Sequence, residues 1–279
     1  MNYKISNTFI LTLALSTVSC YGDFGLNSIT NHMIGELKST IKGKVNHFAR
    51  DYARDRDLNH PKLNMETKRK KIGKRLKFPI NYTTLFSSQN CNQVIQRSAY
   101  ISCYDYNTKG SHILAYRLSK NDLTRGYIQR PDGDPFYDDK AIPRTKRVNA
   151  YSYRGSHYDR GHLRPYASSA YSQEMVNQTY SLVNVLPQTP ELNRKRWVKA
   201  EKYERLIAKK IGQVDVVNIA DYSQSSKRIG RDGILVPTGF YKIIIGNDFK
   251  RCFYYKNSRK HIPNDKLKDH VIDCNSVYY

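Results

Sequence analysis

The sequence predicts an α+β domain built around a mixed, largely antiparallel central sheet that helices flank. Strand-like segments with alternating apolar residues occur both before and after one strongly helical segment, residues 189–212. Turn-forming residues separate those strand-like segments, as they do in antiparallel sheets. A chain of 279 residues is long enough to bury a substantial core.

The first predicted elements form a hairpin. Residues 99–106 and 111–118 alternate as strands do, and Asn107–Gly110 supplies the turn between them. Residues 129–143 follow with an Asp-Gly pair and three prolines, which predicts a long surface loop. Residues 147–163 carry β-forming residues on both sides of a glycine, so we expect a second hairpin there.

Helices are predicted next. Residues 172–184 have a moderate helical pattern, and residues 189–212 have a strong one. Thr189 can cap the second helix, Pro190 suits its first position, and Gly212 suits its end. Three further segments have strand patterns: residues 214–220, 233–246 and 251–256.

The N-terminal residues 1–20 resemble an export signal. Lys4 precedes an apolar run, Phe9–Val18, that is too short to anchor the chain across a bilayer. Lipidation at Cys20 is less favoured, because Thr17 stands where a lipoprotein signal prefers leucine. We therefore expect an exported protein, periplasmic or secreted, with no stable membrane insertion.

Residues 21–80 are polar, basic and poorly periodic, and they predict an extension that is flexible or partly helical. The stretch Thr67–Lys77, which lies within these residues, carries seven cations and no acid. It is either a solvated helix face or a segment that grips phosphates. Residues 81–279 are predicted to form the functional domain.

The charge of the chain points to polyanionic partners. It holds 47 Lys and Arg against 24 Asp and Glu, which gives a net charge of +23. Such a surface attracts nucleic acid most obviously, and anionic membranes and acidic polysaccharides are alternatives. The 23 tyrosines suit base stacking or simply fill strands.

Four cysteines remain besides Cys20. An exported protein favours disulfides, and the short intervening loops favour the pairs Cys91–Cys103 and Cys252–Cys274 over four free thiols. No Cys-x-x-Cys spacing supports a zinc site.

A polar row lies along the strongly helical segment. Asn193, Trp197, Glu201 and Arg205 recur every four residues and so share one helix face. Taken alone, this row is explained by a surface face with a weak Glu201–Arg205 ion pair. The motifs that precede it change this interpretation.

The chain resembles the DNA/RNA non-specific endonuclease family between about Ser111 and Gly246. The resemblance rests on Asp159-Arg160-Gly161-His162, on a Val183–Asn193 segment with Pro-Gln, and on the polar row of the helix. It implies a ββα-metal motif, in which a hairpin presents the base and a helix presents the metal ligand.

The family roles carry over to matching positions. His162 would be the general base, Asn193 the direct ligand of Mg²⁺ (or Mn²⁺), and Glu201 would hold a water on that metal. Arg160 and Arg205 would stabilise charge on the phosphate.

Further residues are expected to support the site. Arg130, rather than Arg125, is the expected upstream arginine, because an acidic loop follows it. The other expected substrate-binding residues are Arg164, Asn184 and Gln188, the last two also orienting the loop that carries the metal ligand. Those expected to shape the site are Asp159, Gly161 and Trp197.

The resemblance implies hydrolysis of phosphodiester bonds in DNA and RNA, with 5′-phosphate products. Two alternatives are another nuclease with the ββα-metal core and an exported polyanion-binding protein with a degenerate site. The sequence does not indicate an oligomeric state.

Overall fold

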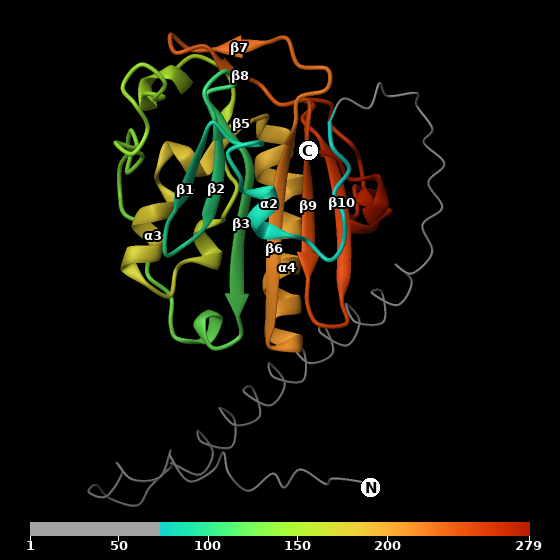
Figure 1. Cartoon of the computed structure of the whole chain (residues 1–279). Helices are drawn as coiled ribbons and strands as arrows, with labels where there is room; N and C mark the ends of the chain where they lie inside the picture. Colours follow the sequence, from blue (N-terminus) through green and yellow to red (C-terminus); the bar gives the residue numbers. More distant parts are fainter. Residues whose placement is uncertain (1–72) are drawn as a thin grey trace, which may run out of the picture. The chain divides into compact units, whose positions relative to one another are not determined.

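The protein is described by a computed structural model, whose residues 73–279 form the α+β fold of Figure 1. Expectations for residues 1–72, including the export signal, Cys20 and most of the basic extension, lie outside these described residues. Within residues 73–279 the α-helices are α2 (Tyr82–Leu85), α3 (Gln173–Thr179) and α4 (Val198–Ile211), and η6 (Leu192–Trp197) is a π-helical turn. Short 3-10 turns are η2 (Asp122–Thr124), η3 (Ala150–Tyr153), η4 (Tyr166–Ser168), η5 (Leu182–Asn184), η7 (Leu267–His270) and η8 (Cys274–Ser276).

The central sheet has seven strands in the order β1-β2-β3-β6-β9-β10-β11, and every neighbouring pair is antiparallel. This confirms the predicted fold class and the predicted first hairpin. Its strands are β1 (Gln93–Gln96), β2 (Ile101–Asp105), β3 (Gly110–Ser119), β6 (Gln213–Asp221), β9 (Gly239–Ile245), β10 (Lys250–Lys256) and β11 (Val271–Ile272). Two small sheets pair β4 (Asp159–His162) with β5 (Val185–Gln188) and β7 (Arg228–Ile229) with β8 (Ile234–Leu235).

Both faces of the central sheet are covered, so alternate side chains of one strand enter two different cores. On β3, Leu114 and Leu118 pack into the core that contains Trp197 and much of α4, whereas Ile113 and Ala115 pack into the other. Figure 1 shows α4 lying along one face of the sheet and α2 on the other. Packing against one face of the sheet holds α4 in place, and α4 carries much of the candidate site.

The second face is covered by segments from both ends of the described chain. Leu76 is buried there, and its N–H donates to the carbonyl of Val277 at 2.9 Å. The folded body therefore begins before residue 81, the boundary that the sequence predicts.

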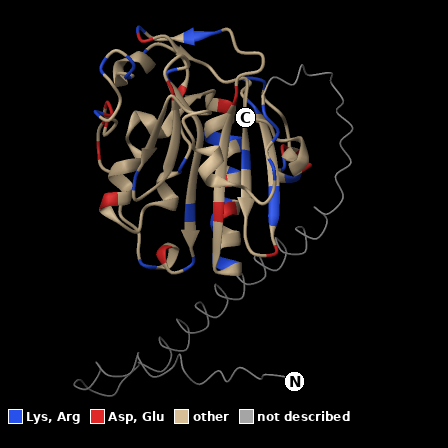
Figure 2. Cartoon of the chain, in the orientation of Figure 1, with Lys and Arg blue, Asp and Glu red and all other residues tan. Residues whose placement is uncertain are grey.

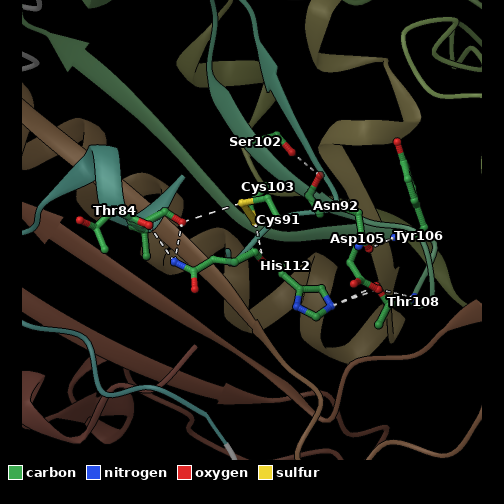
Figure 3. Close-up of a disulfide and its surroundings, with 12 residues drawn as sticks. Thr84, Cys91, Asn92, Ser102, Cys103, Asp105, Tyr106, Thr108 and His112 are labelled. Atoms are coloured by element: carbon green, nitrogen blue, oxygen red, sulfur yellow. Dashed lines mark hydrogen bonds and ion pairs between the residues drawn. A yellow bond between two sulfur atoms is a disulfide. The ribbon is translucent and has the colours of Figure 1, made fainter. Parts of the chain in front are cut away.

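Two disulfides lie in the hydrophobic core on this second face of the sheet. Cys91 pairs with Cys103 and Cys252 with Cys274, which confirms the predicted pairing. Figure 3 shows the first of them beside the β2–β3 turn, where the Asn92 side chain accepts a hydrogen bond from the N–H of Tyr106 at 2.8 Å.

The hairpin predicted over residues 147–163 is wrong. The part before Gly155 forms the turn η3 instead, and β4 finds its partner in β5. Carboxylates from distant segments cause this, because Asp138 accepts from the N–H of Ala150 (3.1 Å) and Asp232 from that of Asn149 (2.7 Å). A backbone N–H that donates to a side chain is not available for a hydrogen bond to a neighbouring strand.

The strongly helical segment is confirmed, with one difference. The Thr189 hydroxyl accepts from the N–H of Leu192 (3.3 Å), and Gly212 ends the helix at a φ of 95°. Its first turns, however, have the wider π-helical geometry of η6, which often occurs at functional sites. The predicted 172–184 helix is shorter, because only α3 is α-helical.

The predicted strands after the helix are confirmed as β6, β9 and β10, with β8 split from β9 before Pro237. None of the helices between residues 73 and 279 has the length and apolar character needed to cross a membrane.

Candidate active site

The candidate site is built on a hairpin followed by a helix. In β4 and β5, Asp159 faces Gln188 and His162 faces Val185 in antiparallel register, and η6 and α4 follow directly. This is the ββα arrangement that the resemblance implies.

Several hydrogen bonds join the helix to β4, and two of them come from the polar row, Asn193 and Trp197. The indole Nε1 of Trp197 donates to the carbonyl oxygen of His162 (3.2 Å), and Nδ2 of Asn193 donates to the carboxylate of Asp159 (3.0 Å). Trp197 is fully buried, packing against Phe240 and Tyr255. The buried indole therefore sets the distance between the two elements.

The imidazole of His162 lies in an aromatic pocket. Its ring is 5.4 Å from that of Phe136 and 6.3 Å from that of Tyr180, and its Nε2 is buried without a hydrogen-bond partner among the described residues. Burial, helped by the positive charge of Arg130, lowers the pKa of His162 to about 3. The imidazole is therefore neutral at pH 7.

Gly161 is required by close packing. A Cβ at this position would lie 2.3 Å from Cδ of Gln188, whose side chain crosses the strand there. The amide of Gln188 is itself buried, and neither its nitrogen nor its oxygen has a partner within residues 73–279. Gln188 thus lies inside the hairpin, next to the motif strand.

The amide of Asn193 has a defined orientation. Asp159 is a carboxylate and can only accept, so it must face Nδ2, and the amide oxygen Oδ1 points elsewhere. Arg194 secures Asp159 from the other side with contacts of 2.7 and 2.8 Å. Within the described chain no hydrogen bond engages Oδ1, which leaves it available as an oxygen ligand.

Glu201 and Arg205 continue the same helix face. Burial raises the pKa of Glu201 to about 7, opposed by the positive charges of Lys242, Arg205 and Arg130. The guanidinium of Arg205 donates to the hydroxyl of Ser168 at 3.2 Å. Glu201 is therefore a carboxylate whose charge state changes close to neutral pH.

Arg130 lies close enough to act on the charges of both His162 and Glu201. Its guanidinium stacks 4.7 Å from the ring of Tyr166. Arg125, the alternative considered from the sequence, instead pairs with Asp122. The structure thus brings Arg130 to the candidate site.

A buried ion pair that was not predicted from the sequence supports the helix. Lys242 and Glu204 are fully buried with Nζ and Oε2 2.5 Å apart, and the hydroxyls of Tyr116 (2.8 Å) and Ser168 (2.9 Å) donate to the same carboxylate. Lys242 also lies 4.7 Å over the Trp197 ring. A lysine within the apolar run of β9 was the available signal, because buried lysines are almost always paired.

Arg160 forms an ion pair with Asp134, a residue that was not among the predicted site residues. Its guanidinium makes a bidentate contact with Asp134 at 2.6 and 3.0 Å and lies 4.8 Å over the Phe136 ring. Phe136 thus contacts both Arg160 and His162, which places these two side chains on one face of β4.

Three predicted substrate contacts lie inside the fold instead: Gln188, which is fully buried in the hairpin, Arg164 and Asn184. Arg164 is 2% exposed, and its guanidinium donates to Ser169 and to the carbonyls of Ala99 and Ser168. Asn184 is fully buried and bonds the backbone N–H and carbonyl of Arg164. A phosphate cannot reach either side chain, because both are enclosed by the fold.

The chain belongs to the DNA/RNA non-specific endonuclease family. Residues 80–276 match the sequence profile of that family, so the similarity extends beyond Ser111–Gly246 on both sides.

Several relatives are similar over part of the chain. Mitochondrial endonuclease G of Bos taurus is 34% identical over 163 residues, covering 55% of this chain and 54% of that protein. A nuclease of Nostoc sp. is 31% identical over 156 residues (55% and 54%), and mitochondrial Nuclease 1 of Schizosaccharomyces pombe is 30% identical over 158 (52% and 49%). The chain spans about half the length of these curated relatives.

A solved structure supports the fold. The crystal structure of a complex between EndoG and EndoGI matches with a TM-score of 0.59 and 24% identity, covering 64% of this chain and 80% of that one.

Proposed function

We propose that this protein is an exported, metal-dependent endonuclease that hydrolyses phosphodiester bonds of DNA and RNA. The observation that carries the proposal is the pair of hydrogen bonds by which Trp197 and Asn193 join the helix to β4. They hold a neutral histidine and a free amide oxygen on adjacent elements of one ββα unit. The family membership supports the substrate class.

His162 accepts the proton of the attacking water. A base must be neutral before it acts, and the buried, aromatic surroundings of the imidazole keep it so at pH 7. Its unpartnered Nε2 is the atom available for this proton.

The donors suit Mg²⁺ or Mn²⁺. No cluster of three or more His, Cys, Asp or Glu exists in the described part of the chain, which disfavours a metal held by protein ligands alone. Magnesium keeps several waters and accepts substrate oxygens, so the single oxygen of Asn193 fits it. When bound, the metal would offset charge on the phosphate and assist the leaving 3′ oxygen.

Glu201 orients water beside Asn193, and the ionised carboxylate is the form that accepts hydrogen bonds from it. Arg205, held by Ser168, stabilises negative charge on the phosphate oxygens, and Arg130 adds to the positive field. These groups address only the sugar-phosphate backbone, so neither base sequence nor the 2′-hydroxyl is read.

Arg160 must exchange partners when substrate binds. Asp134 is half exposed. It contacts the guanidinium of Arg160 in the bidentate geometry that a phosphate would also adopt. The phosphate replaces this carboxylate, which until then holds the side chain of Arg160 over Phe136.

The test is a cleavage assay on plasmid DNA and on RNA, with Mg²⁺, with Mn²⁺ and with EDTA. We expect both substrates to be cut only with metal, and the DNA fragments to be rejoined by ligase without prior phosphorylation because they carry 5′ phosphates. Protein that binds DNA but leaves it intact with either metal would instead be a polyanion-binding protein with a degenerate site.

A further inference from the structure

The loop that leads into β4, residues 151–158, is held in one conformation. The hydroxyl of Ser156 donates to the carbonyl of Tyr153 (2.7 Å) and accepts from the N–H of Tyr158 (3.1 Å). His157 has a left-handed backbone with a φ of 60°. Gly230 packs so closely on Ser152 that a Cβ there would lie 2.2 Å from the Ser152 carbonyl oxygen. The loop is therefore a rigid support.

Cations stack on tyrosines at both ends of this loop. The guanidinium of Arg154 lies 4.3 Å from the ring centre of Tyr151, which is 66% exposed. Lys227 and Arg259, from two other segments of the chain, lie 5.0 and 5.1 Å from the ring centre of Tyr158. We call Arg154, Lys227 and Arg259 the loop cations.

The loop cations have no carboxylate partner among residues 73–279. Eight other lysines and arginines of the described chain do pair with Asp or Glu. Lys227 and Arg259 share one tyrosine ring, so their charges are at most about 10 Å apart, the sum of their two ring distances. Unneutralised positive charges this close repel each other and favour a bound anion.

The loop cations are also close to the candidate site. Tyr158 stands two residues before Arg160 and four before His162, the spacing at which an extended chain returns to the same face. At about 3.3 Å per residue, Tyr158 is roughly 13 Å along the strand from His162. Arg154 lies near enough to Asp134 to help Arg160 lower the pKa of that carboxyl.

We propose that the loop cations bind backbone phosphates a few nucleotides from the one that is cleaved. This rests on the proposed nuclease function. The nucleic-acid strand passes over the Tyr151–Tyr158 loop before it reaches Arg160 and His162. Because only phosphates are bound, the surface serves DNA and RNA alike.

The test compares the K227Q/R259Q variant of the full chain with a matched control, K120Q/K209Q. The control removes two exposed cations at the other end of α4, where the Lys120 N–H donates to the Gly212 carbonyl. Figure 1 shows this end of α4 opposite the end of the molecule that carries β7, and Lys227 directly precedes β7. Figure 2 shows lysines and arginines over much of the described fold, so a charge-matched control is essential.

Binding to a fluorescent 24-base-pair DNA duplex, and to RNA of the same sequence, is measured in EDTA over a range of salt. For K227Q/R259Q we expect weaker binding and a slope of log K against log salt that is shallower by about 1.8, or 0.9 per lost phosphate contact. We expect the same change on RNA, and a smaller one in the control. A slope equal to that of the wild type, or of the control, would overturn the proposal.

Two further measurements complete the design. A chromogenic phosphodiester without flanking nucleotides should give the same kcat/KM with K227Q/R259Q as with the wild type, and a loss on this substrate would count against a role in flanking contacts. If the double variant does not fold, R154Q changes one exposed side chain and should reduce the slope by about 0.9. A wild-type protein that binds but never cuts would overturn the nuclease function and leave the salt slopes to test the surface.

Discussion

The indole Nε1 of Trp197 donates a hydrogen bond to the carbonyl oxygen of His162 across 3.2 Å. The two residues lie 35 positions apart, on the helical and strand parts of the ββα unit. The indole is fully buried in the hydrophobic core. Its hydrogen bond therefore fixes the position of β4, the strand that carries the proposed base, relative to that core.

Asn193→Ala should sharply raise the metal requirement of cleavage. Removal of the amide oxygen deletes the proposed protein ligand, so we expect the half-saturating Mg²⁺ concentration to rise by at least 10- to 100-fold, the effect of losing even an outer-shell partner. Cleavage rates over a Mg²⁺ titration measure this. Asn177→Ala, which changes an exposed asparagine on α3, is the control. An unchanged titration for Asn193→Ala would point to another ligand.

Glu201→Gln should stabilise the metal-free protein at alkaline pH. Folding raises the pKa of this carboxyl from 4.5 to about 7, so the wild-type protein loses stability as the pH rises through that window. Glutamine does not ionise. The variant should therefore exceed the wild type in free energy of unfolding by on the order of 3 kcal/mol at pH 8, with little difference at pH 4.

Urea unfolding in EDTA at the two pH values measures this, with Glu174→Gln on α3 as the control for the substitution itself. An equal increase in the free energy of unfolding at pH 4 and pH 8 would mean that the effect does not come from the charge of Glu201. The same variant should lose cleavage activity, which would make the buried carboxylate a case of stability given up for function.

Lys242→Met should destabilise the protein by about 3–5 kcal/mol, because it leaves the carboxylate of Glu204 buried without its cation. The double variant Lys242→Met/Glu204→Leu removes both charges and should recover much of that loss. Urea unfolding of both single variants and the double variant forms a double-mutant cycle. Additive losses would mean that the two side chains do not act as a pair.

The sequence predicted those parts of the fold that depend on residues close together along the chain. The β2–β3 hairpin, the cap at Thr189 and the end at Gly212 depend on neighbouring residues, and the sequence was sufficient for them. The short loop between Cys91 and Cys103 likewise favoured their pairing.

Features that depend on distant partners were not predicted. Asp138 and Asp232 reach residues 149 and 150 from other segments and replace the expected hairpin with η3. The burial of Arg164 depends on how η4 folds back over it, so its charge alone suggested a surface role. The pairing of Glu204 with Lys242 joins α4 to β9, a contact that spacing along the chain does not reveal.

The most direct test of the proposed mechanism compares cleavage and binding by His162→Ala with those by the wild type. Loss of a general base should lower kcat by about 10²- to 10⁴-fold, while the Kd for DNA and the unfolding midpoint change little. His157→Asn is the matched control, because asparagine tolerates the left-handed backbone at that exposed histidine, and it should cleave normally. Turnover by His162→Ala close to that of the wild type would contradict the role of His162 as the general base.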